Sequence, residues 1–121
     1  QLGPWSSDPR LHMLAADTIL PATLELVPDE IDLLFIDTTH EAWHAAQELR
    51  LWQDKLQDGA IVIVDDLNQH DMNLFWDSLP YEKVPSEAGT CQGVFRYSAA
   101  LRYNGSFDKR EGSTYGGDRI K

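Results

Sequence analysis

Two short apolar runs that each end in aspartate constrain the fold of this chain most. Ile31–Ile36 (IDLLFI) is followed by Asp37, and Ala60–Val64 (AIVIV) is followed by Asp65 and Asp66. Such short, apolar runs are typical of strands that are buried on both faces of a parallel sheet. Because ligands bind at the carboxyl ends of the strands in such sheets, the aspartates mark the place where chemistry is expected.

A long helix is predicted between the two runs. Thr38 or Thr39 can cap its start, and the motif Thr38-Thr39-His40-Glu41 has the spacing of a capping box. Asp58-Gly59 is expected to end the helix. Its apolar residues recur at helical spacing toward one face, at Ala42, Ala45, Ala46, Leu49, Trp52 and Leu56.

Weaker patterns surround this central unit. Leu11–Ala16 is short and apolar and could form another buried strand. The other expected elements are a helix from Asp17 or Thr18 to about Val27, a helix over Asp71–Leu79, and two strands over Tyr81–Val84 and Gly93–Tyr97. This alternation predicts an α/β fold with a mostly parallel sheet and a C-terminal antiparallel hairpin.

Length and charge divide the chain into two parts. Its 121 residues suffice for one domain. Residues 1–98 carry 5 basic and 17 acidic groups, whereas residues 99–121 carry 5 basic and 3 acidic groups and are rich in Gly and Ser. We therefore interpret residues 1–98 as the folded domain and residues 99–121 as a polar, flexible C-terminal tail.

The composition argues against several classes of partner. A formal net charge of −10 repels nucleic-acid backbones and anionic membrane surfaces. The apolar runs are far shorter than the roughly 20 residues that a membrane-spanning helix needs. The single cysteine, Cys91, allows no internal disulfide, so a reducing, cytoplasmic location is expected.

The aspartates that follow the two runs suggest a metal site. If the strands are neighbours in one parallel sheet, the carboxylates of Asp37, Asp65 and Asp66 meet at one edge. Oxygen donors of this kind suit Mg²⁺ or Ca²⁺, and without a cation they would repel each other. In the alternative interpretation, Asp37 caps the following helix and the pair of acids begins a solvated loop.

Two histidines follow the first run. His40 comes three residues after Asp37, where an imidazole could serve as a general base, or could simply be exposed near a helix start. His40-Glu41-Ala42-Trp43-His44 also matches H-E-x-x-H, in which two histidines one turn apart bind Zn²⁺. A zinc hydrolase is therefore a further hypothesis, although the motif lies in the first turns of the helix and a third ligand is not evident.

The combination of these motifs resembles the second half of a class I S-adenosylmethionine-dependent methyltransferase. Their order is similar to the branch that contains small-molecule and sugar O-methyltransferases and cephalosporin-hydroxylase-like proteins. The matching pieces are Asp37-Thr38-Thr39-His40, Asp58-Gly59-Ala60, Asp65-Asp66 and the upstream Ala16-Asp17-Thr18. The resemblance covers about residues 11–98 and implies a partial Rossmann-like methyltransferase fold.

The resemblance also implies roles for individual residues. Asp37, Asp65 and Asp66 would be the ligands of a divalent metal, with Mg²⁺ expected. His40 would be the base that deprotonates a hydroxyl of a small-molecule acceptor, and Asp17 and Thr18 would lie near the adenine of S-adenosylmethionine. The metal would hold the acceptor oxygen against the methyl donor.

One part of the family pattern is missing from the sequence. The glycine-rich cofactor loop has no counterpart, because no Gly-x-Gly occurs among the eight glycines. We therefore expect a domain that is incomplete at its N-terminus, and a non-catalytic, self-associating remnant is an alternative to an enzyme. The missing strands would leave an edge of Ile31–Ile36 unpaired. We therefore expect a homodimer that buries this edge or the helical faces beside it, unless Leu11–Ala16 pairs with the edge instead.

Overall fold

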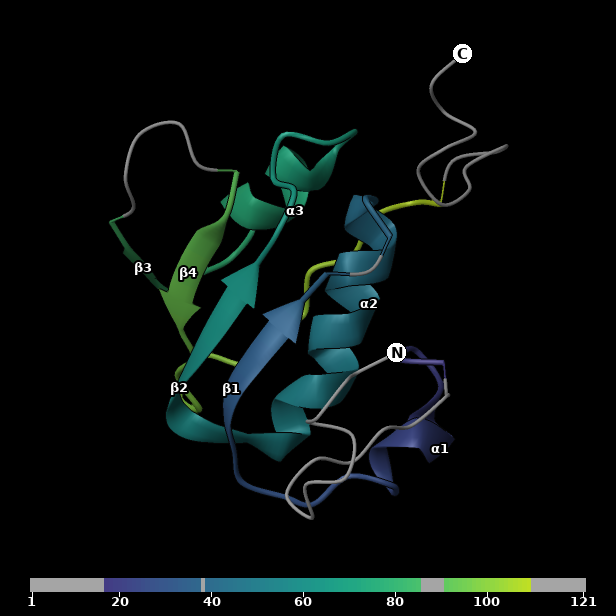
Figure 1. The fold of residues 1–121 in the computed structure, drawn as a ribbon, viewed down its shortest axis with the longest axis vertical. Helices are drawn as coiled ribbons and strands as arrows, with labels where there is room; N and C mark the ends of the chain where they lie inside the picture. Colours follow the sequence, from purple (N-terminus) through teal and green to yellow (C-terminus); the bar gives the residue numbers. More distant parts are fainter. Residues whose placement is uncertain (1–16, 38, 86–90, 110–121) are drawn as a thin grey trace, which may run out of the picture.

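The computed structural model describes residues 17–37, 39–85 and 91–109. Helices pack against a four-stranded sheet in this part of the chain (Figure 1). The elements are α1 (Pro21–Leu24), β1 (Ile31–Ile36), α2 (Ala42–Trp52), the 3-10 helix η2 (Gln53–Lys55), β2 (Leu56–Val64), α3 (Met72–Asp77), β3 (Glu82–Val84) and β4 (Gly93–Arg96). The α/β fold predicted from the sequence is confirmed.

The strand order of the sheet is β1-β2-β4-β3. Only β1 and β2 are parallel, whereas β2 pairs antiparallel with β4 and β4 antiparallel with β3. The expected C-terminal antiparallel hairpin is present, but the prediction of a mostly parallel sheet is wrong. The reason is that the returning strand of this hairpin, β4, takes the second edge of β2.

The parallel pair differs in length from the prediction. β1 covers the predicted residues, but β2 begins at Leu56, before the predicted Ala60. Asp58-Gly59 therefore lies inside a strand instead of ending a helix. Gly59 has a φ of 86°, which glycine adopts without a steric cost, and its N–H donates to the carbonyl of Tyr97 at 2.8 Å. This bond extends the pairing of β2 with the chain after β4.

The starts of the first two helices also differ from the prediction. The carboxylate of Asp17 accepts the N–H of Ile19 at 3.0 Å, so it closes a turn and does not cap α1, which spans one turn only. The N-cap residue of α2 is Glu41, and the Glu41 side chain forms no capping hydrogen bond with the helix. Thr39 Oγ1 is buried and has no hydrogen-bond partner among the described residues, while Thr38 lies outside them.

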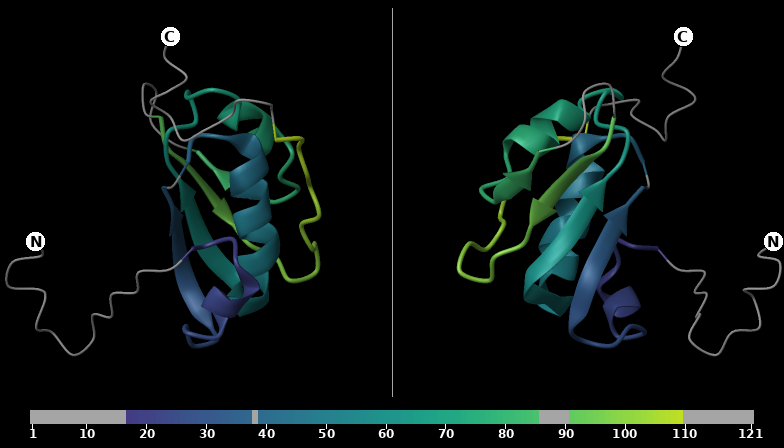
Figure 2. Two further views of the ribbon diagram at one scale, coloured as in Figure 1. Left: turned by 90° about the vertical axis from the view of Figure 1, so that its right-hand side faces the viewer. Right: turned by 60° about the vertical axis from the view of Figure 1, so that its left-hand side comes forward.

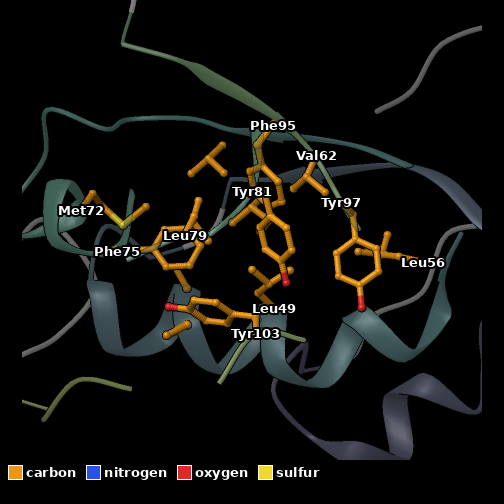
Figure 3. Close-up of a cluster of buried hydrophobic side chains, with 14 of the residues drawn as sticks. Leu49, Leu56, Val62, Met72, Phe75, Leu79, Tyr81, Phe95, Tyr97 and Tyr103 are labelled. Atoms are coloured by element: carbon orange, nitrogen blue, oxygen red, sulfur yellow. The ribbon is translucent and has the colours of Figure 1, made fainter. Parts of the chain in front are cut away.

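The core lies between the sheet and the helices α2 and α3. Its side chains interdigitate over the inner face of the sheet (Figure 3), and the largest fully buried ones are Phe75, Phe95, Leu49, Met72, Val62 and Val64. The described helices leave the other face of the sheet uncovered (Figure 2, right). On β1, Leu33 and Phe35 are accordingly 58% and 51% exposed.

Residues 99–109 run along α2 on the side away from the sheet (Figure 2, left). Tyr103 is 3% exposed, and both its backbone N–H and its carbonyl bind the side-chain amide of Gln53, at 2.9 and 2.8 Å. The guanidinium of Arg50 donates to the carbonyl of Gly105. This first part of the predicted tail therefore contributes to the core, whereas residues 110–121 and Leu11–Ala16 lie outside the described residues.

Within the described ranges, no helix has the length and apolar character that crossing a membrane requires.

Candidate functional site

The parallel pairing of β1 and β2 places their carboxyl ends side by side. Ile36 pairs with Val64, and the N–H of Asp65 donates to the carbonyl of Ile36 at 3.0 Å. The next residue of each strand is an aspartate, so Asp37 and Asp65 begin from neighbouring backbone positions. The sheet register therefore brings the predicted site residues to one edge.

Three carboxylates converge at this edge. One oxygen from each of Asp37, Asp65 and Asp66 lies within 4.8 Å of the other two. Asp37 is exposed and the other two are partly buried. Among the described residues, this is the one group of three or more acidic, histidine or cysteine side chains whose ligand atoms lie this close together.

Mutual repulsion is visible in the electrostatics of Asp37. The loss of surrounding water raises the pKa of its carboxyl group, and the negative charges of Asp65 and Asp66 raise it further. A hydrogen bond with Asp66 adds to the rise, while His40 opposes it. A cation placed between these carboxylates would remove the repulsion.

His40 joins the acidic group through Asp66. Its Nε2 lies 2.9 Å from Asp66 Oδ2, and the two side chains are 21% and 30% exposed. Asp66 has a φ of 58°, in the left-handed region that Asp tolerates better than most residues, and its N–H donates to Asp65 Oδ1 at 2.9 Å. The ring of His70 stacks beside that of His40, with 6.4 Å between the centroids.

His44 faces a different part of the molecule. It is 9% exposed, and its Nδ1 lies 3.6 Å from Glu48 Oε1 one turn along α2. Its ring and the ring of Trp43 form a T-shaped pair, with 5.2 Å between the centroids. Across residues 17–37, 39–85 and 91–109, no group of three close ligand atoms includes His40 and His44, so the geometry there offers no support for the zinc hypothesis.

Comparison with known families decides the class of protein. A sequence model described as a methyltransferase domain matches residues 6–67, just over half of the chain. The chain belongs to the methyltransferase domain family. The matched range contains β1, α2 and β2, together with the acidic edge that they form. No curated protein matches the chain significantly.

Membership of this methyltransferase family directs attention to Asp17 and Thr18, which precede α1. The hydroxyl of Thr18 donates to the carboxylate of Glu48, and its carbonyl accepts the indole N–H of Trp52 at 2.8 Å. Thr18 thereby lines a cavity of about 180 Å³, which is formed by Thr18, Leu34, Phe35, Ile36, Glu48 and Trp52. Asp17 is exposed beside it, with its carboxylate bound to the backbone of Ile19.

Three residues of the candidate site were not predicted from the sequence. Glu48 is 3% exposed and holds Thr18, and its i,i+4 spacing from His44 was the signal that could have revealed it. His70 contacts the His40 ring from the loop after β2. Asp71 binds the start of α2 across 29 residues of sequence, and no local pattern indicates such a contact.

Proposed function

We propose that the protein transfers a methyl group from S-adenosylmethionine to a hydroxyl group of a small molecule, with the help of a divalent metal ion, Mg²⁺. The proposal rests above all on one observation, the convergence of three carboxylates within 4.8 Å at the carboxyl edge of the parallel strand pair. The family supplies the reaction class, and the acidic edge suggests how the acceptor is handled.

The donor set fits a hard divalent cation. Asp37, Asp65 and Asp66 offer only carboxylate oxygens, which Mg²⁺ prefers, and no soft sulfur or imidazole ligand belongs to the group. The raised pKa of the Asp37 carboxyl group fits the same interpretation, because the negative charges of its neighbours contribute to it. A bound Mg²⁺ would supply Lewis acidity and fix the position of the acceptor oxygen.

His40 is suited to take the proton of the acceptor hydroxyl. When Nε2–H donates to Asp66 Oδ2, the neutral ring carries its lone pair on Nδ1. Asp66 thus fixes both the tautomer and the orientation of the base. A negatively charged partner also stabilises the imidazolium that forms once His40 has accepted the proton.

The cavity beside Thr18 is the proposed place of the cofactor's adenine. Trp52 gives it an aromatic wall, and the Glu48 carboxylate can accept a hydrogen bond from an exocyclic amine. At about 180 Å³, it is smaller than the roughly 300–1,000 Å³ of sites that enclose a whole drug-sized ligand. It would therefore hold only the adenine ring system. The sulfonium of S-adenosylmethionine, which supplies the methyl group, would lie outside this cavity.

Calorimetric titration of the full chain tests this function. S-adenosylmethionine should bind, and Mg²⁺ should bind to the wild type but at least about tenfold more weakly to Asp65→Asn, which removes one proposed ligand charge. Asp58→Asn is the matched control, because Asp58 lies at the opposite end of β2 and should leave Mg²⁺ binding unchanged.

The outcomes separate the alternatives. Cofactor binding without Mg²⁺ binding would keep the methyltransferase and remove the metal from the proposal. No binding of S-adenosylmethionine would instead favour a non-catalytic, self-associating protein. We also propose a cytoplasmic location, since Cys91 is an exposed free thiol and such thiols persist in a reducing compartment.

A further inference from the structure

The start of α2 is capped by Asp71, the residue that precedes α3. The N-cap residue of α2, Glu41, makes no side-chain capping bond, and the first turn of α2 contains no acidic residue. Instead, the N–H of Ala42 donates to Asp71 Oδ1 at 2.9 Å. Asp71 therefore places a negative charge at the positive end of the α2 dipole and satisfies one of its free N–H groups.

Asp71 uses its side chain in an unusual way for its position. It is the N-cap residue of α3, yet it forms no side-chain capping bond with α3. Its backbone carbonyl accepts the N–H of Leu74 at 2.9 Å, while its carboxylate reaches across to α2. Since Ala42 is fully buried and Met72 is 1% exposed, this bond lies where little water can compete with it.

The bond connects the two loops that carry the candidate site. The first loop lies between β1 and α2 and includes Asp37 and residues 39–41, and the second loop, residues 65–71, lies between β2 and α3. His40 lies on the first loop and Asp66 on the second, and they are also joined, at 2.9 Å. These two contacts hold the loops together, one inside the site and one at its base, in addition to the contacts of Asp37 with Asp66 and of His40 with His70.

We propose that Asp71 is a positioning residue for the acidic site. By holding the start of α2 against the second loop, it sets the spacing between His40 and Asp66, and with it the position of Asp37 relative to Asp65. Asp66 and His70 have positive φ values of 58° and 45°, so the second loop has a backbone that needs support from outside itself. The inference rests on the proposed function only where it concerns the bound metal.

Titration with Mn²⁺ alone, followed by electron paramagnetic resonance, is the first test. Asp71→Ala and Asp71→Asn remove the same charge, but only Asn keeps an oxygen that can accept the Ala42 N–H. We expect Asp71→Ala to bind Mn²⁺ at least about tenfold more weakly than Asp71→Asn, the usual loss when an outer partner of a metal site is removed. Equal affinities in the two folded variants would overturn the proposal.

Asp77→Ala is the matched control for this titration. Asp77 is an exposed aspartate at the other end of α3, so its removal should leave Mn²⁺ affinity within about twofold of the wild type. Circular dichroism at the titration temperature verifies that each variant is folded. A merely structural role of Asp71 would lower the melting temperature of Asp71→Ala without separating the Mn²⁺ affinities of its two variants.

A second test requires no metal and distinguishes failure of this inference from failure of the proposed function. Urea unfolding of Asp71→Ala, Asp66→Ala and the double variant forms a double-mutant cycle. If the Asp71–Ala42 and His40–Asp66 contacts support one another, the two substitutions are not independent. The change in unfolding constant of the double variant should then differ at least about threefold from the product of the changes caused by the single substitutions. Additive effects would overturn the inference even if the protein binds Mn²⁺, and coupling would uphold it even if Mn²⁺ does not bind.

Discussion

The imidazole of His40 and the carboxylate of Asp66 lie 2.9 Å apart, although 26 positions separate them in the sequence and each belongs to a different loop. The contact links the segment after β1 to the segment after β2. It connects the candidate base to the acidic group. The predictions below follow from this arrangement and from the packing that supports it.

Replacing His40 should affect catalysis much more than replacing His44. In an assay of methyl transfer from S-adenosylmethionine, His40→Ala should lower turnover by about 10²–10⁴-fold, the usual contribution of a general base. His44→Gln should have little effect on turnover, because His44 is buried against Glu48 on α2. Equal losses from both variants would point to a zinc pair instead.

Neutralising Asp37 should stabilise the metal-free protein at neutral pH. The raised pKa of the Asp37 carboxyl group means that the folded state binds a proton more readily than the unfolded state, so this group lowers stability as the pH rises through its folded pKa. Asp37→Asn removes that penalty. Because Asp37 is exposed, the rise in melting temperature with a chelator present should be modest, no more than about 4 °C.

The pH dependence provides the control for Asp37→Asn. The advantage over the wild type should shrink as the pH falls through the pKa of the folded Asp37, since the wild-type carboxyl group is then protonated as well. Added Mg²⁺ should raise the melting temperature of the wild type more than that of Asp37→Asn. An Asp37→Asn variant that is less stable at every pH would show that the carboxylate is favourably paired.

Gly93→Ala should destabilise the fold through a steric clash. A Cβ at Gly93 would lie 2.6 Å from a ring carbon of Trp76 and 2.7 Å from Leu67 Cδ1, closer than carbon atoms can approach. Overpacking of this kind costs about 1–3 kcal/mol, which chemical denaturation can measure. Trp76→Leu should partly rescue Gly93→Ala by making room, and full stability of Gly93→Ala alone would contradict the tight packing at this position.

The homodimer remains a prediction, now with a defined surface. In the described sheet, β1 has β2 as its one neighbour, and its exposed Leu33 and Phe35 flank the open edge. Sedimentation velocity at micromolar concentration should show a dimer for the wild type and a monomer for Phe35→Lys, because a charge beside an edge strand opposes pairing. Leu74→Lys, on α3, replaces another exposed apolar residue and should leave the dimer intact. A monomeric wild type would rule the dimer out.

Local patterns sufficed to predict the elements that carry the site. β1 has the predicted bounds because its short apolar run is flanked by polar residues. The prediction that both of its faces are buried is wrong, since β1 lies at the edge of the described sheet and its outer residues Leu33 and Phe35 are exposed. The acids that follow β1 and β2 could be placed at one edge because the carboxyl ends of parallel neighbours coincide. The capping prediction for α1 was wrong, since Asp17 and Thr18 find partners other than the helix start that follows them. The capping prediction for α2 was wrong because this helix begins only after Glu41.

The sequence by itself determined the α/β class, the parallel pair β1–β2 and the acidic edge, because these depend on residues close together in the chain and on a short connection. Only the tertiary structure decided that β4 joins β2 and makes most strand pairs antiparallel, that Tyr103 is buried in the core, and that Asp71 caps α2. Each of these depends on contacts between segments far apart in the sequence. Such contacts are selected by the burial of surface and the satisfaction of backbone donors in the folded chain, and no local periodicity records them.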